Sequence, residues 1–314
     1  MRKITVEAPA SSANLGPGFD VFALALARPS DRVTLRSEKS ARLTVGIRQV
    51  SGATIPVAAA RNSAGAVCLA MAEDRGLGER IAVEISKGVP IGIGMGSSGA
   101  SAAAAAVGMN QLFDLEMSSD ELIFYAGKGE EVTSGAAHYD NVSASVLGGF
   151  VVVGGGTRPS AIRFDAPKDM SLCVVTPVVK LPKRKTKYAR SLLPKSVSLK
   201  MMVSNVANAS LIVSGFALGD TEMIGRGMND RVVEESRKTM VPGYDAVRES
   251  AAEAGAAGTC ISGAGPSILA VIDRGKARPG AVLDAMVSRF GREGVRSDGF
   301  VTEVGEGARE IESR

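Results

Sequence analysis

Hydrophobic and polar residues alternate in several short segments of the N-terminal half of the chain. The alternation is clear at 3–8 and 32–36 and less regular at 42–47, and it predicts β-strands. Residues 62–75 carry apolar side chains at helical spacing, and residues 80–86 return to a strand pattern. The first half is therefore expected to combine strands with helices.

A glycine-rich segment runs directly into an alanine-rich one over residues 90–108, PIGIGMGSSGASAAAAAVG. This pattern predicts a loop followed by a helix. Ser118 and Glu121 have the spacing of a capping box, which predicts the start of the next helix. A short apolar strand is expected at 148–156, and its three final glycines indicate a domain boundary.

The second half contains fewer clear strands and several helical segments. In chain order we expect a strand at 172–176, a basic loop, helices between 197 and 254, strands at 258–261 and 267–272 joined by SGAGPS, a helix at 277–290 and a strand at 299–304. Strands grouped with helices, without strict alternation, favour an α+β fold. A chain of 314 residues suits two domains, which we expect at 1–156 and 157–314.

Composition narrows the class of protein. Hydrophobic residues make up 45% and charged residues 22%, as in ordinary globular proteins, and the net charge of +4 fits an enzyme of anionic metabolites. Cys68, Cys173 and Cys260 lack zinc-site or redox-motif spacing, which predicts reduced thiols in a cytoplasmic protein. The start lacks the apolar run of a signal peptide, and the alanine-rich stretch 100–107 is too short to cross a bilayer, so no membrane association is expected.

The glycine loop is suited to a phosphate chain. Gly92, Gly94 and Gly96 let the backbone approach a ligand, and Ser97 and Ser98 begin a helix whose N-terminus offers free N–H groups. The simpler interpretation is a flexible connection before a buried helix. The sequence lacks G-x-x-x-x-G-K-[ST], which argues against a P-loop enzyme.

A match to G-x-G-x-x-G at Gly94, Gly96 and Gly99 does not make this a dinucleotide site. Such a site needs the glycines directly after a strand, whereas residues 87–93 intervene here. NAD binding is therefore not expected.

A second glycine segment, 262–267, lies between two predicted strands and is either a simple turn or part of a binding site.

Residues 129–149 concentrate acidic and amide side chains. Glu130, Glu131, Asp140 and Asn141 fall within twelve positions of one another, together with His138, the only histidine of the chain. A multi-histidine metal site is excluded, and a lone histidine is more often structural than catalytic. Carboxylates beside a phosphate loop suggest Mg²⁺-dependent phosphoryl transfer.

Taken together, these motifs resemble those of the GHMP kinases. PIGIGMGSSGASAAA is similar to the central phosphate motif of that family and SGAGPS to its C-terminal glycine motif, while residues 9–26 and 134–142 resemble the members that phosphorylate homoserine. The resemblance implies an N-terminal domain like domain 2 of ribosomal protein S5 and a ferredoxin-like C-terminal domain. It also implies ATP and Mg²⁺, L-homoserine as phosphoryl acceptor and a homodimer.

The resemblance also implies roles for individual residues. ATP would contact Asn62, near the adenine, and the loop formed by Pro90, Ile91, Gly92, Ile93, Gly94, Met95, Gly96, Ser97, Ser98, Gly99 and Ala100. Mg²⁺ would be held by Ser98 and Glu130. Homoserine would contact Asn14, Asp20, His138, Asp140, Asn141, Arg190 and Arg237, and the C-terminal glycine loop is Gly263, Ala264 and Gly265. Asp140 or Asn141 would orient the attacking hydroxyl, and which of them accepts a proton, if either does, stays open.

Two other functions fit parts of the sequence. Another GHMP kinase, of the shikimate or pantoate type, would share the glycine motifs. A nucleic-acid-binding module could use the basic residues Lys180, Lys183, Arg184, Lys185, Lys187 and Arg190. That segment contains a single aromatic residue, Tyr188, which serves base stacking poorly, so no nucleic-acid partner is expected.

Overall fold

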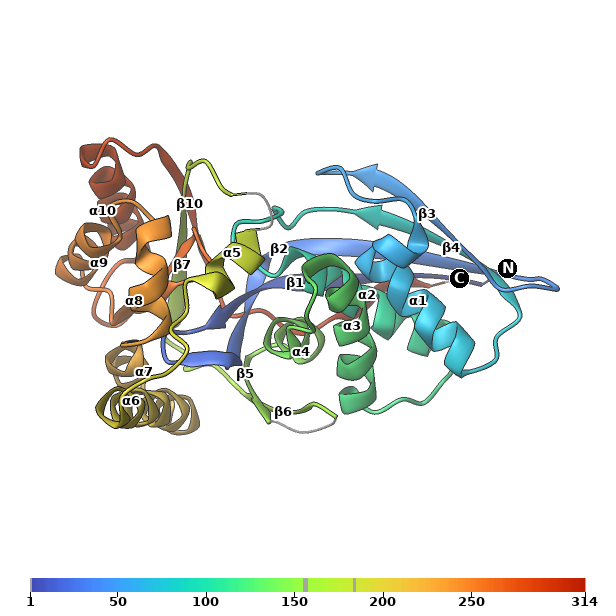
Figure 1. The fold of residues 1–314 in the computed structure, drawn as a ribbon, viewed down its shortest axis with the longest axis horizontal. Helices are drawn as coiled ribbons and strands as arrows, with labels where there is room; N and C mark the ends of the chain where they lie inside the picture. The colour runs from blue at the N-terminus through green and yellow to red at the C-terminus, as the bar shows by residue number, and fades with distance from the viewer. Residues whose placement is uncertain (1, 155–157, 183–184, 314) are drawn as a thin grey trace.

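The computed structural model describes residues 2–154, 158–182 and 185–313, and within these ranges the strands form two sheets (Figure 1). The strands are β1 (Arg2–Asn14), β2 (Gly18–Lys39), β3 (Thr44–Ser51), β4 (Glu79–Ser86), β5 (Phe150–Gly154), β6 (Ser160–Phe164), β7 (Met170–Pro177), β8 (Gly258–Ile261), β9 (Ile268–Asp273), β10 (Ser297–Thr302) and β11 (Arg309–Ser313). The helices are α1 (Ser63–Asp74), α2 (Ser97–Leu112), α3 (Ser119–Ser134), α4 (Tyr139–Leu147), α5 (Lys185–Ser191), α6 (Leu199–Leu218), α7 (Thr221–Gly227), α8 (Val233–Arg237), α9 (Tyr244–Glu253) and α10 (Pro279–Arg292).

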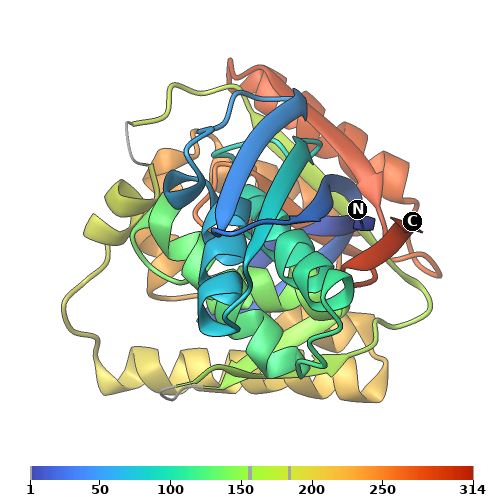
Figure 2. The same ribbon diagram turned by 90° about the vertical axis from the view of Figure 1, so that its right-hand side faces the viewer.

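The first sheet has the order β11-β1-β2-β4-β3, with β5 pairing to β2 and β6 to β5. Strands β1 and β2 form a long antiparallel pair. Residues 10–14 of β1 extend this pair beyond residues 3–8, where apolar and polar side chains alternate, and lead toward the second half of the chain. Helices α2 and α4 contact β1 and β2, α1 contacts β3 and β4, and α3 packs against α1, α2 and α4. Figure 2 shows the two chain ends beside each other, where β11 pairs with β1.

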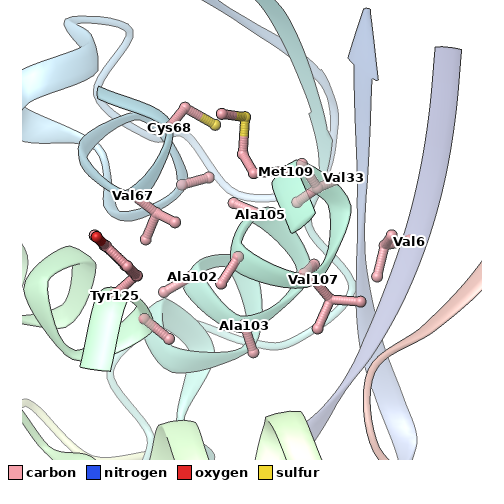
Figure 3. Packing of buried hydrophobic residues seen from close by; sticks show 14 of the residues in the cluster. Val6, Val33, Val67, Cys68, Ala102, Ala103, Ala105, Val107, Met109 and Tyr125 are labelled. Atoms are coloured by element: carbon pink, nitrogen blue, oxygen red, sulfur yellow. The ribbon is translucent and has the colours of Figure 1, made fainter. Parts of the chain in front are cut away.

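The alanine run of α2 lies at the centre of the first core. Ala102–Ala106 are fully buried, and their short side chains let α2 lie close to its neighbours. Figure 3 shows Ala102, Ala103 and Ala105 among Val6 and Val33 of the sheet, Val67 of α1 and Tyr125 of α3. The tight packing fixes the N-terminal end of α2 relative to the sheet.

The second sheet, β10-β7-β9-β8, is covered on both faces. Alternate residues of β7 point to opposite sides: Cys173 contributes to the core with α9 and α10, whereas Leu172 contributes to a core shared with the first half. In this shared core Phe150 of β5 stacks on Phe216 of α6, with ring centroids 4.0 Å apart. The two halves therefore meet through an apolar contact that fixes their relative position.

The predicted α+β class is confirmed, and most predicted helices and strands appear with shifts of a few residues, although β1 extends to Asn14 and β2 begins at Gly18, well before the predicted segment 32–36. One prediction was wrong, because residues 185–191 form helix α5 where a basic loop was expected. Strands β6 and β11 were not predicted, and both follow residue 156 yet belong to the first sheet. The boundary at 156 stays a prediction, and Gly155 and Gly156 lie outside the described residues.

Candidate active site

A cavity of about 510 Å³ opens between the two halves, where the β1–β2 turn, the two glycine loops, α3, α4, α5 and α8 converge. Most residues assigned to a site line it: Asn14, Asp20, Asn62, Ile91, Gly92, Gly94, Met95, Gly96, Ser97, Ser98, Glu130, His138, Asp140, Asn141, Arg190, Arg237, Gly263 and Ala264. The structure thus brings together residues that are more than 200 positions apart in the sequence.

Five assigned residues do not line this cavity: Pro90, Ile93, Gly99, Ala100 and Gly265. Ile93 and Ala100 pack into the core shared by the two halves. A Cβ atom on Gly99 would lie 3.5 Å from the Asn141 Cβ, so this glycine faces α4. Gly265 instead presents its carbonyl to the Lys185 Nζ. A role for the other four in binding ATP stays a prediction.

The first glycine loop ends on the N-cap of α2. Gly96 occupies this position in the left-handed conformation, with φ 63°. A Cβ there would lie 2.2 Å from the Ser11 Oγ and 2.8 Å from the Asn141 Oδ1, so only glycine fits without displacing these two side chains. The first turn of α2, including Ser97 and Ser98, therefore faces the cavity with the free N–H groups of a helix N-terminus.

The two glycine loops contact each other. The Ser262 hydroxyl donates to the Gly94 carbonyl at 2.7 Å, and the Ser267 amide donates to the Ile93 carbonyl at 3.2 Å. A Cβ on Gly94 would lie 2.2 Å from the Ser262 carbonyl oxygen. These contacts hold the two loops together, so the second loop helps to shape the wall of the cavity.

Glu130 lies on α3 and is 5% exposed at the cavity wall. Its Oε1 is 3.1 Å from the His138 Nδ1. Burial by itself lowers the pKa of His138, but the hydrogen bond and charge of Glu130 outweigh it, so the pKa is raised. The histidine assigned to the substrate pocket therefore also holds Glu130 in place.

The oxygen donors at this wall suit Mg²⁺. Within the described residues no group of three or more His, Cys, Asp or Glu could hold a metal ion by itself. Mg²⁺ normally combines one or two carboxylates with substrate phosphates and water, and Glu130 with the Ser98 hydroxyl supplies such a partial set beside the phosphate loop. The residues present therefore fit a metal that arrives with a nucleotide.

Asp140 and Asn141 begin α4 directly beside the α2 N-terminus. Asp140 is 2% exposed, and its carboxylate accepts from the Asn141 amide at 2.8 Å. Burial, with a smaller contribution from the charge of Asp20, raises the pKa of Asp140 to about 6. The Asn141 Oδ1 accepts from the Ser11 hydroxyl at 3.0 Å, so its amide group has a defined orientation.

The far end of the cavity carries charges of both signs. Arg190 of α5 forms an ion pair with Asp20, with its Nη2 2.9 Å from Oδ2 and 3.0 Å from Oδ1. Arg237 of α8 is 4% exposed and donates to the Gly263 carbonyl at 3.2 Å. Both guanidinium groups lie over the Phe19 ring, 5.3 and 5.1 Å from its centroid. The two arginines from separate segments thus converge on one site, as their assignment required.

Sequence reasoning missed several residues of this wall. Lys185 lines the cavity, and burial, with the nearby Arg237 charge, lowers its pKa to about 8. Lys87 lines it as well, from the end of β4. The segment KLPKRKTKYAR already pointed to Lys185 as a charged residue, and Phe19 falls within the motif 9–26, whereas the sequence pattern gave no signal for Lys87. Lys183 and Arg184 of the same segment lie outside the described residues.

Comparison with known proteins confirms the architecture that the sequence motifs implied. The family model for the GHMP kinases N terminal domain matches residues 62–149, and that for the GHMP kinases C terminal domain matches residues 212–292. A homoserine kinase of Natronomonas pharaonis is 42% identical over 97% of this chain and 99% of its own, and one of Thermoplasma volcanium is 39% identical over 98% and 97%. The crystal structure of a homoserine kinase from Cytophaga hutchinsonii superposes with a TM-score of 0.89 at 35% identity, covering 98% of this chain and 97% of that one.

Proposed function

The chain belongs to the GHMP kinase family, and we propose that it transfers the γ-phosphoryl group of ATP to the hydroxyl of L-homoserine, giving O-phospho-L-homoserine for threonine biosynthesis. The observation that carries this proposal is the pairing, in one cavity, of a glycine-lined helix N-terminus with a site that contains both an acidic and two basic side chains. The first part suits the phosphates of ATP and the second suits an amino acid.

The nucleotide phosphates would lie against the first turn of α2. Its N–H groups and helix dipole favour negative charge, and transfer through a loose transition state asks mainly for alignment and charge stabilisation. Ser98 and Glu130 would hold Mg²⁺, which when bound neutralises charge on the phosphates. Asn62 is the N-cap of α1, where its Oδ1 accepts from the Gly65 amide at 3.1 Å, and it would face the adenine side.

The acceptor would lie between α4 and α5. Asp20 would meet its ammonium group, and Arg190 and Arg237 its carboxylate, where a guanidinium can donate two parallel hydrogen bonds. The Asn141 amide, oriented by Ser11, would align the hydroxyl with the phosphate. Asp140 is nearly fully buried and accepts from the Asn141 backbone amide, so we assign it to fixing the start of α4.

An activity screen tests this function. We expect Mg²⁺-dependent ATP turnover with L-homoserine, and much weaker turnover with shikimate, pantoate, mevalonate or galactose. Phosphorylation of shikimate or pantoate without homoserine would disprove the acceptor while leaving the family intact. Steeply salt-dependent binding to mixed DNA or RNA would favour the nucleic-acid function. However, Lys185 and Arg190 line the cavity, so they are poorly placed to form an extended nucleic-acid surface.

We further infer that the enzyme is a homodimer, formed through α6. This helix has one charged residue, Lys200, in 20, and Leu199, Val203 and Val206 are 71%, 57% and 59% exposed along one outward stripe. The helix is about 30 Å long, and an apolar stripe on its outer face suits an antiparallel copy of itself in a two-fold interface.

By length and mean hydropathy, 1.5, α6 could also cross a bilayer, and 17% of its most apolar window is buried. The inner face of α6 argues against a membrane span, because the Asn205 amide donates to Asp230 and the Asn208 amide to the Asn229 carbonyl, each at 2.7 Å.

Light scattering should give a dimer for the wild type and a monomer for Val203→Glu/Val206→Glu, whereas Ile162→Glu on the separate strand β6 should stay dimeric. A monomeric wild type, or one that sediments with lipid vesicles, would contradict the dimer.

We also assign the enzyme to the cytoplasm. All three cysteines fall in the described part of the chain, where each is buried and free, and burial raises the pKa of Cys68 to about 12. Thiols of this kind are typical of a reducing compartment.

A further inference from the structure

A completely buried carboxylate lies beneath the first glycine loop. Asp31, on β2, is 0% exposed and does not line the cavity. Its Oδ1 accepts from the Gly88 and Val89 amides at 3.0 and 2.9 Å, where the chain leaves β4 for the loop. Its Oδ2 accepts from the Ser101 hydroxyl at 2.6 Å, in the second turn of α2. One side chain therefore joins the start of the loop to the helix at its end.

Lys87 completes this connection. Its Nζ donates to the Asp31 carboxylate, to the Ser97 carbonyl at 2.7 Å and to the Ser101 hydroxyl at 3.0 Å. An ammonium group has three N–H bonds, so these partners engage its donors fully. The Ser97 hydroxyl donates in turn to the Val89 carbonyl at 2.9 Å. Lys87 reaches the cavity wall, yet its side chain is only 3% exposed.

Buried ion pairs contribute little net stability, because removing two charges from water offsets much of their attraction. Burial lowers the pKa of Lys87, and the Asp31 charge opposes this. A connected set of buried polar groups with every member hydrogen-bonded does, however, restrict the geometry of the segments that it joins. Here both of those segments border the phosphate site.

We propose that Asp31 and Lys87 are positioning residues for the nucleotide. Through Ser97 and Ser101 they set the distance between the start of the glycine loop and the first turn of α2, and thereby aim the helix N–H groups at the phosphates. Neither residue needs to touch ATP. The proposal rests on the ATP-dependent function given above and adds two residues outside the glycine motif to it.

The alternative role for Lys87 is direct contact with a phosphate, and the two roles predict opposite effects of Asp31→Asn. If Asp31 merely restrains Lys87, its neutralisation frees the ammonium, and ATP binds as tightly as before or more tightly. If the pair positions the loop, the same change loosens the loop, and ATP binds more weakly. A misplacement of about 1 Å can cost on the order of 100-fold in a reaction, so an effect of roughly tenfold on affinity is expected here.

The experiment combines calorimetric titration of ATP and Mg²⁺ into folded protein without homoserine with steady-state kinetics in which homoserine is varied. Asp31→Asn and the uncharged pair Asp31→Asn/Lys87→Met should both raise the Kd for ATP about tenfold, with the KM for homoserine changed less than about twofold. The double variant leaves no unpaired buried charge, so if Asp31→Asn alone does not fold, hydrogen exchange in the double variant decides: unchanged exchange at residues 97–101 would contradict the positioning role. Amide hydrogen exchange at residues 97–101 should accelerate, while exchange in α3 should not.

A matched control is Lys3→Met, which removes the 2.7 Å ion pair between Lys3 and Glu312 far along the sheet. It should leave ATP affinity unchanged. Unchanged or tighter ATP binding in both Asp31 variants, or an equal loss for ATP and homoserine, would overturn the positioning role. Failure of the wild type to bind ATP would instead disprove the proposed function.

Discussion

The two ends of the cavity are built in different ways. At the nucleotide end the ligand would meet backbone N–H groups, held by glycine conformations, the Asp31–Lys87 connection and contact between two loops. At the acceptor end the ligand would meet charged side chains, and Asp20 and Arg190 already pair with each other. The first end is organised before the ligand arrives, whereas a substrate at the second must replace an existing ion pair. Changes in the two ends should therefore separate ATP from homoserine kinetics.

The largest effect is expected at the boundary between the two ends. Glu130→Gln should lower kcat about 100- to 1000-fold, because it removes the carboxylate assigned to Mg²⁺, and it should raise the Mg²⁺ concentration needed for half-maximal rate. Glu131→Gln is the control, since Glu131 is exposed and does not line the cavity. Equal, mild effects of the two substitutions would remove Glu130 from the metal site.

A pair of glycine variants tests whether the nucleotide end depends on the contact between the loops. Gly94 and Gly92 both have positive φ, 93° and 80°, so alanine strains either by about 1–2 kcal/mol. A Cβ on Gly94 would also meet the Ser262 carbonyl at 2.2 Å, whereas one on Gly92 meets nothing within 4 Å. Gly94→Ala should therefore weaken ATP binding on the order of 100-fold. Similar Kd values for the two variants would show that the loops do not depend on each other.

At the acceptor end, Arg190→Ala should reduce kcat/KM for homoserine by about 2–3 kcal/mol, roughly 30- to 150-fold. The KM for ATP should hardly change. Arg190→Lys should recover only part of the loss, since an ammonium cannot form the two-pronged contact with a carboxylate. Arg237→Ala should also act on homoserine, with an added loss of stability because this side chain is buried. Unchanged homoserine kinetics, or an equal rise in both KM values, would contradict the assignment.

The smallest effect concerns pH. The pKa of Asp140 is raised from its ordinary 3.8 to about 6, so folding favours the protonated form. Its contribution to stability is complete below about pH 4 and is lost as the pH rises through 6. The difference in free energy of unfolding between wild type and Asp140→Asn should therefore shift against the wild type by roughly 1–3 kcal/mol between pH 4 and 7. Denaturant titrations at several pH values measure this, and a flat difference would contradict it.

Much of the first half of the chain was predictable from the sequence. A glycine loop before an alanine-rich helix, the capping box at Ser118 and the alternation in the strands are all local signals, because they depend on residues within a few positions. The capping box forms as predicted, with the Ser118 amide donating to the Glu121 carboxylate at 2.9 Å. The resemblance to GHMP kinases rests on several motifs that occur in the family's order along the chain, so it too could be recognised from the sequence alone.

Other features were decided only by the tertiary structure. β11 is an edge strand with weak alternation, and it forms because β1 offers an unpaired edge 300 residues away in sequence. Likewise, the sequence contains Asp20 and Arg190, or Asp31 and Lys87, without any indication that they pair. Local patterns fix which backbone conformations are favourable, but contacts between distant residues depend on how whole elements pack. In this protein the sequence determined that a glycine loop leads into a helix, and the packing of two halves around Phe150 and Phe216 decided which side chains face that loop.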